Sequence, residues 1–319
     1  MTRTRTVFLG TSTFAAAVLE RLAAGEHRPA LALTRPDRPR GRGRKLGAPP
    51  VAQAARRLGI ALEQPENVNA PASCELIARA NPDAVIVCAF GALISEPLLS
   101  QHELLNVHPS LLPRWRGAAP VERAIMAGDE RTGVSIMRLT AGLDSGPVCL
   151  AEQMGIESHR DTYGSLTERL QALGGELIVR VLDRAAGGDP LMFVEQDEDG
   201  VTYAEKIGPE DRLLDPARPA GELERVVRAL HPHVGARVAL ADGTLLGVHR
   251  AVLADASSPG YAPVGAGTDA GDGELEPGVA TRDGRLLLDC TPGVLELLCV
   301  QPPGGRSMDA GAYLRGHAR

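Results

Sequence analysis

An amide, an imidazole and a carboxylate stand at two polar turns of this sequence, and their residue types suit acyl transfer. Asn106 and His108 are two residues apart, and Asp144 follows in the turn Leu143-Asp-Ser-Gly-Pro147. Side chains two apart on an extended strand share a face, so the amide and the imidazole can converge on one atom. Together they supply donors for a tetrahedral oxyanion and a base for the nucleophile's protons. We therefore expect Asn106, His108 and Asp144 to be catalytic.

Each of these residues also has a plain structural interpretation. A lone histidine is more often structural than functional, and an aspartate before Ser-Gly-Pro is common in tight turns. Gly142 and Gly146 permit a tight backbone around Asp144, which would let its carboxylate approach His108. Three compatible groups in one crevice favour the chemical interpretation.

The elements expected around these residues alternate between strands and helices. Continuous apolar runs are expected as strands at 6–9, 29–34, 83–90, 104–107 and 133–139, and helical patterns occur at 14–23, 50–58, 74–80 and 163–185. Continuous apolar strands separated by helices are typical of a parallel sheet covered on both faces. Because ligands of such sheets bind beyond the carboxyl ends of strands, we expect the His108 and Asp144 loops to form one crevice.

The pattern changes after residue 189. Residues 190–206 are rich in charge and are expected to be a linker between a catalytic domain at 1–189 and a C-terminal domain at 207–319. Hairpin signals at Asp242-Gly243 and Asp283-Gly284 follow a helical pattern at 220–230, which predicts a small β-barrel. Residues 255–277 are dominated by Gly, Ala, Pro, Ser and acids and are expected to be a flexible surface excursion.

Composition limits the classes of function. The 319 residues carry a net charge of −6, so any contact with nucleic acid must come from a local basic cluster. Five cysteines without a C-x-x-C pair indicate a cytoplasmic protein without a structural metal. His231-x-His233 has no evident third metal ligand, and no apolar run reaches the roughly 20 residues that span a membrane. The local basic cluster is present at 35–45, with Arg38, Arg40, Arg42, Arg44 and Lys45.

These motifs together resemble the folate-dependent formyltransferases. The resemblance rests on Asn106-x-His108-x-Ser110-Leu-Leu-Pro113 and Leu143-Asp144-x-Gly146, and the stretch Pro113-Arg-Trp-Arg-Gly-Ala-Ala-Pro120 is similar to members that act on methionyl-tRNA. Matches near the start, in the basic cluster and at Val201-Thr-Tyr-Ala-Glu-Lys206 extend it over nearly the whole chain. It implies a Rossmann-like α/β catalytic domain, a linker and an OB-like C-terminal domain.

The resemblance also implies a reaction and its partners. A formyl group would pass from 10-formyltetrahydrofolate to the α-amino group of methionine on initiator tRNA, with no metal and in a monomer. Asn106 and His108 would hydrogen-bond the formyl oxygen, and Asp144 would position the imidazole and help to move a proton. Folate would be bound by Ser110, Leu111, Leu112, Pro113, Phe14, Phe90 and Gly91.

For the tRNA, the resemblance implies two binding surfaces. The Arg38–Lys45 cluster would enter the acceptor stem, with Arg42 foremost. The C-terminal domain would add a backbone-binding edge that contains Arg225, Arg228, His231, His233 and Arg237.

Two alternatives remain at this stage. A formyltransferase acting on an amino sugar nucleotide or on glycinamide ribonucleotide would share Asn106, His108 and Asp144, although the basic cluster and the barrel disfavour it. A non-catalytic tRNA-binding protein of the same fold is the other alternative, and an assay of formyl transfer separates it from an enzyme.

Overall fold

The computed structural model describes residues 4–40, 45–254 and 278–317, and the chain divides into two compact units. The first unit contains Met1–Pro120, Arg131–Met154 and Thr167–Ala204, and the second contains Val121–Glu130, Gly155–Leu166 and Glu205–Arg319. Each unit is therefore built from separate stretches of the chain. Most of the expected linker, up to residue 204, clusters with the first unit.

The first unit is built on a seven-stranded sheet with the order β10-β9-β7-β6-β1-β2-β5. The strands are β1 (Thr6–Gly10), β2 (Leu31–Leu33), β5 (Ala61–Glu63), β6 (Ala84–Cys88), β7 (Leu104–His108), β9 (Arg131–Arg138) and β10 (Val148–Gly155). Five of them, from β5 through β7, run parallel. The strand order reverses between β1 and β6, which is where open α/β sheets bind ligands. This confirms the parallel-dominated α/β fold.

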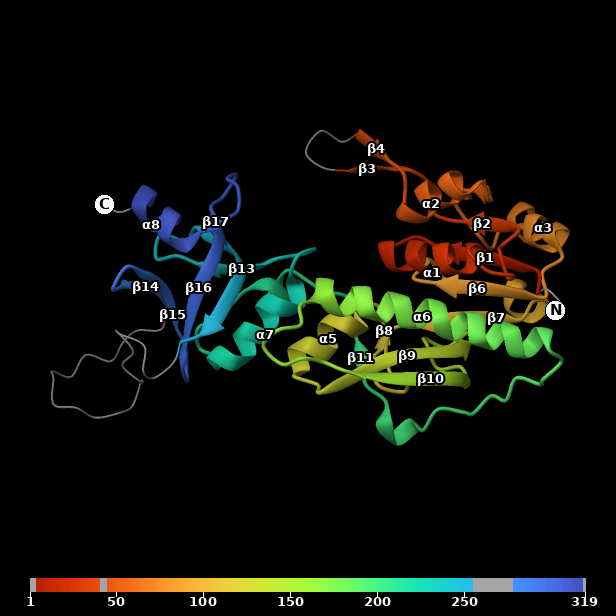
Figure 1. The fold of residues 1–319 in the computed structure, drawn as a ribbon. Coiled ribbons are helices and arrows are strands. Elements are labelled where there is room, and N and C mark those ends of the chain that lie inside the picture. The colour runs from red at the N-terminus through yellow and green to blue at the C-terminus, as the bar shows by residue number, and fades with distance from the viewer. Residues whose placement is uncertain (1–3, 41–44, 255–277, 318–319) are drawn as a thin grey trace. The chain divides into compact units, whose positions relative to one another are not determined.

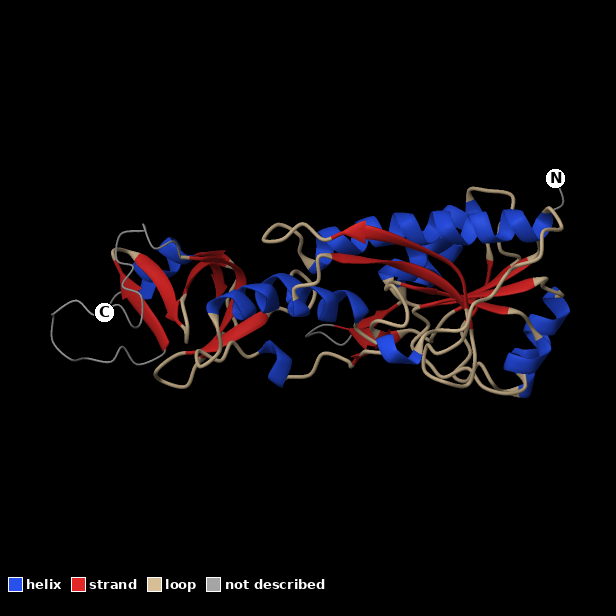
Figure 2. Cartoon of the chain, turned by 90° about the horizontal axis from the view of Figure 1, so that it is seen from below, coloured by secondary structure: helices blue, strands red, loops and turns tan. Residues whose placement is uncertain are grey.

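Helices cover both faces of this sheet (Figures 1 and 2). They are α1 (Thr13–Ala23), α2 (Pro50–Leu58), α3 (Pro71–Ala80), α4 (Leu98–Gln101) and α6 (Tyr163–Ala186). Cys74 and Ile77 of α3 join a buried cluster with Leu104 of β7. On the other face, a Cβ built at Gly174 of α6 would lie 3.0 Å from the side chain of Val107. Because side chains alternate along a strand, Asn106 and His108 point to the α3 face.

Strand β9 runs antiparallel to β7, which corrects one step of the sequence argument. Leu105 pairs with Arg138 and His108 pairs with Ser135, so the carboxyl end of β9 lies beside the amino end of β7. Asp144 therefore does not follow a strand end at the same edge as His108. It reaches His108 because residues 139–147 fold back along β7 before β10 begins.

Short elements complete the first unit. Two-stranded pairs are formed by β3 (Arg38–Arg40) with β4 (Lys45–Gly47) and by β8 (Arg116–Gly117) with β11 (Tyr203–Ala204). Val194 also bridges Val148, and a 3-10 turn spans Glu198–Gly200. Residues 194–204 thus pair with the first unit at both ends of the segment.

The second unit contains a curled antiparallel sheet with α7 (Ala220–Leu230) packed on it. The strands are β12 (Ala236–Ala239), β13 (Leu245–Leu253), β14 (Gly278–Arg282), β15 (Arg285–Asp289), β16 (Val294–Gln301) and β17 (Met308–Asp309), in the order β12-β13-β16-β15-β14 with β17 on β16. Asp283 and Gly284 have φ of 49° and 72°, as a tight hairpin requires. Both predicted hairpins are confirmed. The excursion at 255–277 lies outside the described residues.

The remaining elements of the second unit are helical. They are α5 (Pro120–Ala127), α8 (Ala310–His317) and a 3-10 turn at Glu210–Arg212. Leu223, Val227 and Leu230 of α7 are buried with apolar side chains of the sheet. Among the residues that the structure describes, no helix has both the length and the apolar character to cross a membrane.

Candidate active site

Asn106 and His108 lie at the carboxyl end of β7, on one face of the strand. Asn106 is 7% exposed and His108 is 4% exposed. Burial of polar side chains is costly unless they are hydrogen-bonded, so their partners define the site.

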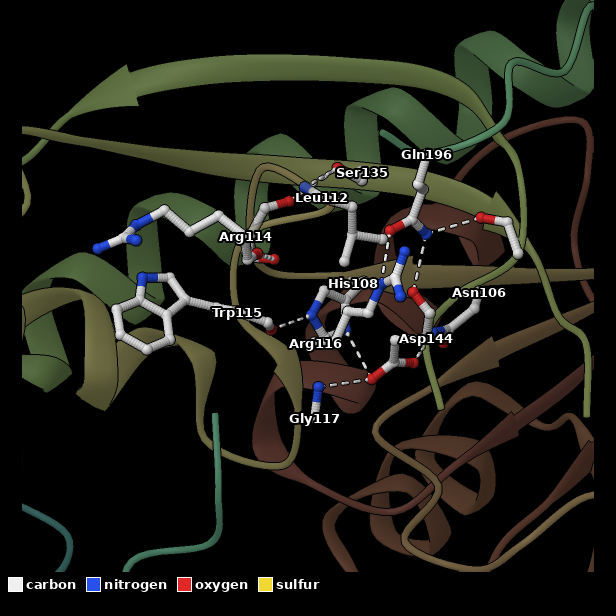
Figure 3. Close-up of polar contacts among 12 residues, drawn as sticks. Asn106, His108, Leu112, Arg114, Trp115, Arg116, Gly117, Ser135, Asp144 and Gln196 are labelled. Carbon is white, nitrogen blue, oxygen red and sulfur yellow. Dashed lines mark hydrogen bonds and ion pairs between the residues drawn. The ribbon is translucent and has the colours of Figure 1, made fainter. Parts of the chain in front are cut away.

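Asp144 brings the three predicted catalytic residues together (Figure 3). Its Oδ1 accepts a hydrogen bond from Nδ2 of Asn106 at 3.3 Å, and its Oδ2 lies 3.6 Å from Nδ1 of His108. The backbone N–H of Gly117 donates to the same Oδ2 at 2.9 Å. One carboxylate thus contacts the amide, the imidazole and the loop after β7.

The other nitrogen of the imidazole is held by the backbone. Nε2 of His108 lies 2.9 Å from the carbonyl oxygen of Trp115. A carbonyl cannot donate, so the hydrogen of this bond is on Nε2. Trp115 has a φ of 65°, and this left-handed conformation is part of the turn that places its carbonyl oxygen beside Nε2.

The Asp144 turn depends on a glycine. A Cβ at Gly146 would lie 1.9 Å from the carbonyl oxygen of Arg138, which no side chain can tolerate. Asp144 itself has a φ of 44°, a conformation that costs a non-glycine residue on the order of 1 to 3 kcal/mol. The tight backbone predicted around Asp144 is present, and other contacts must hold it.

Those contacts come from residues that the sequence analysis did not identify. Gln196 donates to the backbone oxygens of Asp144 and Gly146 and accepts from Arg116. Arg116 also donates to Glu198 at 3.1 Å and is 3% exposed. The sequence shows Arg116 inside the 113–120 motif, but its burial, and with it the need for an acceptor, is seen only in the structure. No signal in the sequence pointed to Gln196, because its segment has a linker's composition.

The Ser110–Pro113 segment forms a rigid turn beside His108. Ser110 is fully buried, and its hydroxyl donates to the backbone oxygen of Arg114 at 2.7 Å. The hydroxyl of Ser135 donates to the oxygen of Ser110 and accepts from the N–H of Leu112. Leu111, Leu112 and Pro113 remain partly exposed. They offer an apolar surface next to the predicted catalytic residues.

Phe14 lies in the first turn of α1, which follows β1, and Phe90 and Gly91 follow β6. The two phenylalanines are 6% and 5% exposed, whereas Gly91 is exposed. The hydroxyl of Thr11 donates to the oxygen of Phe90 at 2.7 Å, which ties the two strand ends together. Phe14 and Phe90 therefore support the switch point from within the core, and Gly91 lies at its surface.

The basic cluster is a β-ribbon where the structure describes it. Arg38 pairs with Gly47, and the backbone of Arg40 pairs with that of Lys45. The side chain of Arg38 is 60% exposed and 3.8 Å from Glu66. Arg42 and Arg44 lie outside the described residues.

The prediction of a tRNA-binding edge on the second unit is wrong for Arg228. Arg228 is 8% exposed, and its Nε donates to Glu224 at 2.6 Å while a terminal nitrogen donates to the oxygen of Asp161. A buried, paired guanidinium is not free to bind a phosphate. Arg225 donates to the oxygen of Met126, and His233 contacts Glu122 at 2.9 Å. Arg228 therefore serves the interior of the second unit, whereas Arg225 is half-buried and His233 is exposed.

Comparisons with known proteins identify the family of both parts of the chain. The formyl transferase family matches residues 4–182, and the formyl transferase C-terminal domain matches residues 206–318. Methionyl-tRNA formyltransferase from Halorhodospira halophila is 42% identical, over 98% of this chain and 96% of that protein. The protein of the same name from Methylococcus capsulatus is 40% identical, over 98% and 97%.

Solved structures share the fold at low sequence identity. HypX from Aquifex aeolicus in complex with tetrahydrofolic acid superposes with a TM-score of 0.64 at 16% identity, over 98% of this chain and 47% of HypX. This chain therefore spans about half the length of HypX. An N-formyltransferase from Helicobacter canadensis, solved with folinic acid and dTDP-3-aminofucose, has a TM-score of 0.64 at 12% identity, over 92% and 98%.

Proposed function

This chain belongs to the formyltransferase family, and from that membership we propose that it formylates methionyl-tRNA. It is an enzyme that transfers the formyl group of 10-formyltetrahydrofolate to the free α-amino group of the methionine, for translation initiation. Relatives named methionyl-tRNA formyltransferase, similar over nearly the full length of both chains, support the tRNA substrate. They do not favour an amino sugar nucleotide, glycinamide ribonucleotide or a non-catalytic role. The tetrahydrofolic acid bound to HypX supports a folate co-substrate.

The arrangement around Asp144 carries this proposal. The α-amine of methionine attacks the formyl carbon, a nitrogen–carbon bond forms, and the carbonyl oxygen becomes an oxyanion. The side-chain amide of Asn106 donates a hydrogen bond to that oxygen. The Nε2–H of His108 leaves the carbonyl of Trp115 and donates to the same oxygen. The carbon–nitrogen bond to folate then breaks, and the proton lost by the amine passes to the folate nitrogen. Asp144, 3.6 Å from the imidazole, stabilises the ring while it carries that proton.

The exposed residues around this centre suggest where the substrates bind. We place the folate ring against Leu111, Leu112 and Pro113, with Gly91 at its edge and Phe14 and Phe90 behind the wall. The basic ribbon that begins at Arg38 contacts tRNA phosphates, and Arg42 is the foremost reader. The oxyanion donors and the tRNA contacts are then separate, so each can be removed alone.

Formylation of charged initiator tRNA by the purified protein tests the proposal. With 10-formyltetrahydrofolate as donor, the product is N-formylmethionyl-tRNA, and free methionine or an amino sugar nucleotide does not compete. Asn106→Ala and His108→Ala each reduce turnover about 10²- to 10³-fold, the effect of losing an oxyanion donor. Affinity for tRNA stays near that of the wild type. Equal loss of turnover and tRNA affinity contradicts the assignment.

A further inference from the structure

Both polar atoms of the Gln196 side chain are hydrogen-bonded, and they join the two loops of the site (Figure 3). Its Nε2 donates to the backbone oxygen of Asp144 at 2.8 Å and to that of Gly146 at 2.7 Å. Its Oε1 accepts from Nε of Arg116 at 2.9 Å. An amide nitrogen carries two hydrogens, so both donors are used on consecutive parts of one turn.

These bonds act on the peptide groups that set the direction of the Asp144 side chain. The left-handed φ of 44° is unfavourable for aspartate and persists when surrounding contacts hold it. The oxygen of Asp144 belongs to the peptide that follows its Cα, so fixing this oxygen restrains the backbone from which the carboxylate extends. The carboxylate lies 3.6 Å from His108 and 3.3 Å from the amide of Asn106. Small rotations of the turn would lengthen both distances.

Gln196 is itself held in place. Arg116 is buried between Gln196 and Glu198, with its terminal nitrogen 3.1 Å from the glutamate. The same segment is tied to the loop after β7, because Thr202 accepts from the N–H of Arg116 at 2.9 Å and its hydroxyl accepts from the N–H of Trp115 at 2.8 Å. The amide thus has a fixed orientation before substrate binds, which is a requirement for positioning.

We propose that Gln196 is a positioning residue for the formyl transfer. Through the backbone of Asp144 and Gly146 it holds the carboxylate at its distance from His108. It acts through Asp144 and belongs to the segment 194–204 that pairs with the first unit. This inference rests on the proposed function of the site and adds a residue from outside the two catalytic loops.

Gln196→Met tests it, because methionine has a similar length and shape and neither donates nor accepts in the same way. We expect kcat to fall on the order of 10²-fold, as for a catalytic group displaced by about 1 Å, with unchanged KM for methionyl-tRNA and folate. Gln153→Met is the matched control, since Gln153 is exposed on β10 of the same unit. It keeps wild-type kcat. Loss of folded protein would also lower the apparent kcat at unchanged KM, but it would do so by the same factor when Asp144 is already substituted.

A double-mutant cycle with Asp144→Asn shows whether Gln196 acts through Asp144. If it does, Gln196→Met adds little to the loss already caused by Asp144→Asn. Fully additive losses, or a Gln196→Met protein as active as Gln153→Met, overturn the inference. Should Gln196→Met fail to fold, Gln196→Asn keeps the amide and withdraws it by one methylene, and wild-type kcat in that variant overturns the inference equally. A wild-type protein that forms no formylmethionyl-tRNA instead overturns the proposed function.

Discussion

Each unit of this protein holds an imidazole beside a carboxylate at nearly the same distance. In the first unit, Nδ1 of His108 lies 3.6 Å from Asp144, and in the second, Nδ1 of His159 lies 3.7 Å from Glu224. The imidazole side chains differ greatly in exposure, at 5% for His108 and 65% for His159. Proximity of histidine and carboxylate therefore does not by itself mark a catalytic pair.

The other partners of the carboxylates make the difference. Glu224 accepts from Arg228 at 2.6 Å, so its charge is balanced inside the second unit. Asp144 accepts from the amide of Asn106 and the N–H of Gly117, which are both neutral. Neutral donors fix a carboxylate without cancelling its charge, and the charge remains available to stabilise a proton that reaches His108.

The same substitution in both pairs gives the largest expected contrast. Asp144→Asn keeps the size of the side chain and removes its charge, so we expect kcat to fall about 10²- to 10⁴-fold, the usual contribution of acid and base catalysis. Glu224→Gln leaves kcat unchanged. Steady-state formylation at saturating methionyl-tRNA measures both. Comparable losses in the two variants would remove the distinction between the pairs.

For the free energy of unfolding, we expect the larger loss from Glu224→Gln. Glu224→Gln leaves Arg228 buried without a balancing charge, and loss of one partner of a buried pair costs about 3 to 5 kcal/mol. Circular dichroism during urea unfolding reports the loss across the chain. Trp115 is the single tryptophan and lies in the first unit, so its fluorescence transition serves as an internal control. A fluorescence transition that shifts as much as the dichroism would contradict a loss confined to the second unit.

The basic ribbon, in which the side chain of Arg38 is 60% exposed, extends the comparison to the proposed tRNA contacts. Arg42→Ala removes one phosphate contact, so the slope of the logarithm of tRNA affinity against that of salt concentration becomes shallower by about one unit or less. Turnover at saturating tRNA is unchanged. Titrations of labelled initiator tRNA at several salt concentrations measure the slope. An unaltered affinity and slope would assign tRNA recognition elsewhere.

A smaller effect concerns a second imidazole of the second unit. Burial, followed by the nearby His249 and His233, lowers the pKa of His231 below its ordinary 6.5. As pH falls below about 6.5 the unfolded chain takes up this proton before the folded one, so stability declines until the folded pKa is passed. His231→Gln should make the slope of unfolding free energy against pH shallower between pH 7.5 and 5. An unchanged slope relative to wild type would show that His231 does not titrate in this way.

The sequence predicted which three residues meet at this site better than it predicted the contacts that hold them there. Asn106, His108 and Asp144 are recognisable because few residue types perform acyl transfer, and the strand before His108 is a continuous apolar run. Gln196 escaped prediction because it acts on backbone oxygens, which every residue possesses. The direction of β9 escaped too, since an apolar run does not state its direction, and Arg228 resembled a surface cation until Glu224 was found beside it.

The discontinuous makeup of the second unit limits how this enzyme could be recombined with its relatives. The C-terminal family match begins at residue 206, yet Arg225, Arg228 and His233 reach back to Met126, Asp161 and Glu122. In a chimera joined at residue 206, these side chains would meet the loops of a different homologue. An exchange of specificity between homologues therefore requires that residues 121–130 and 155–166 be transferred together with the C-terminal half.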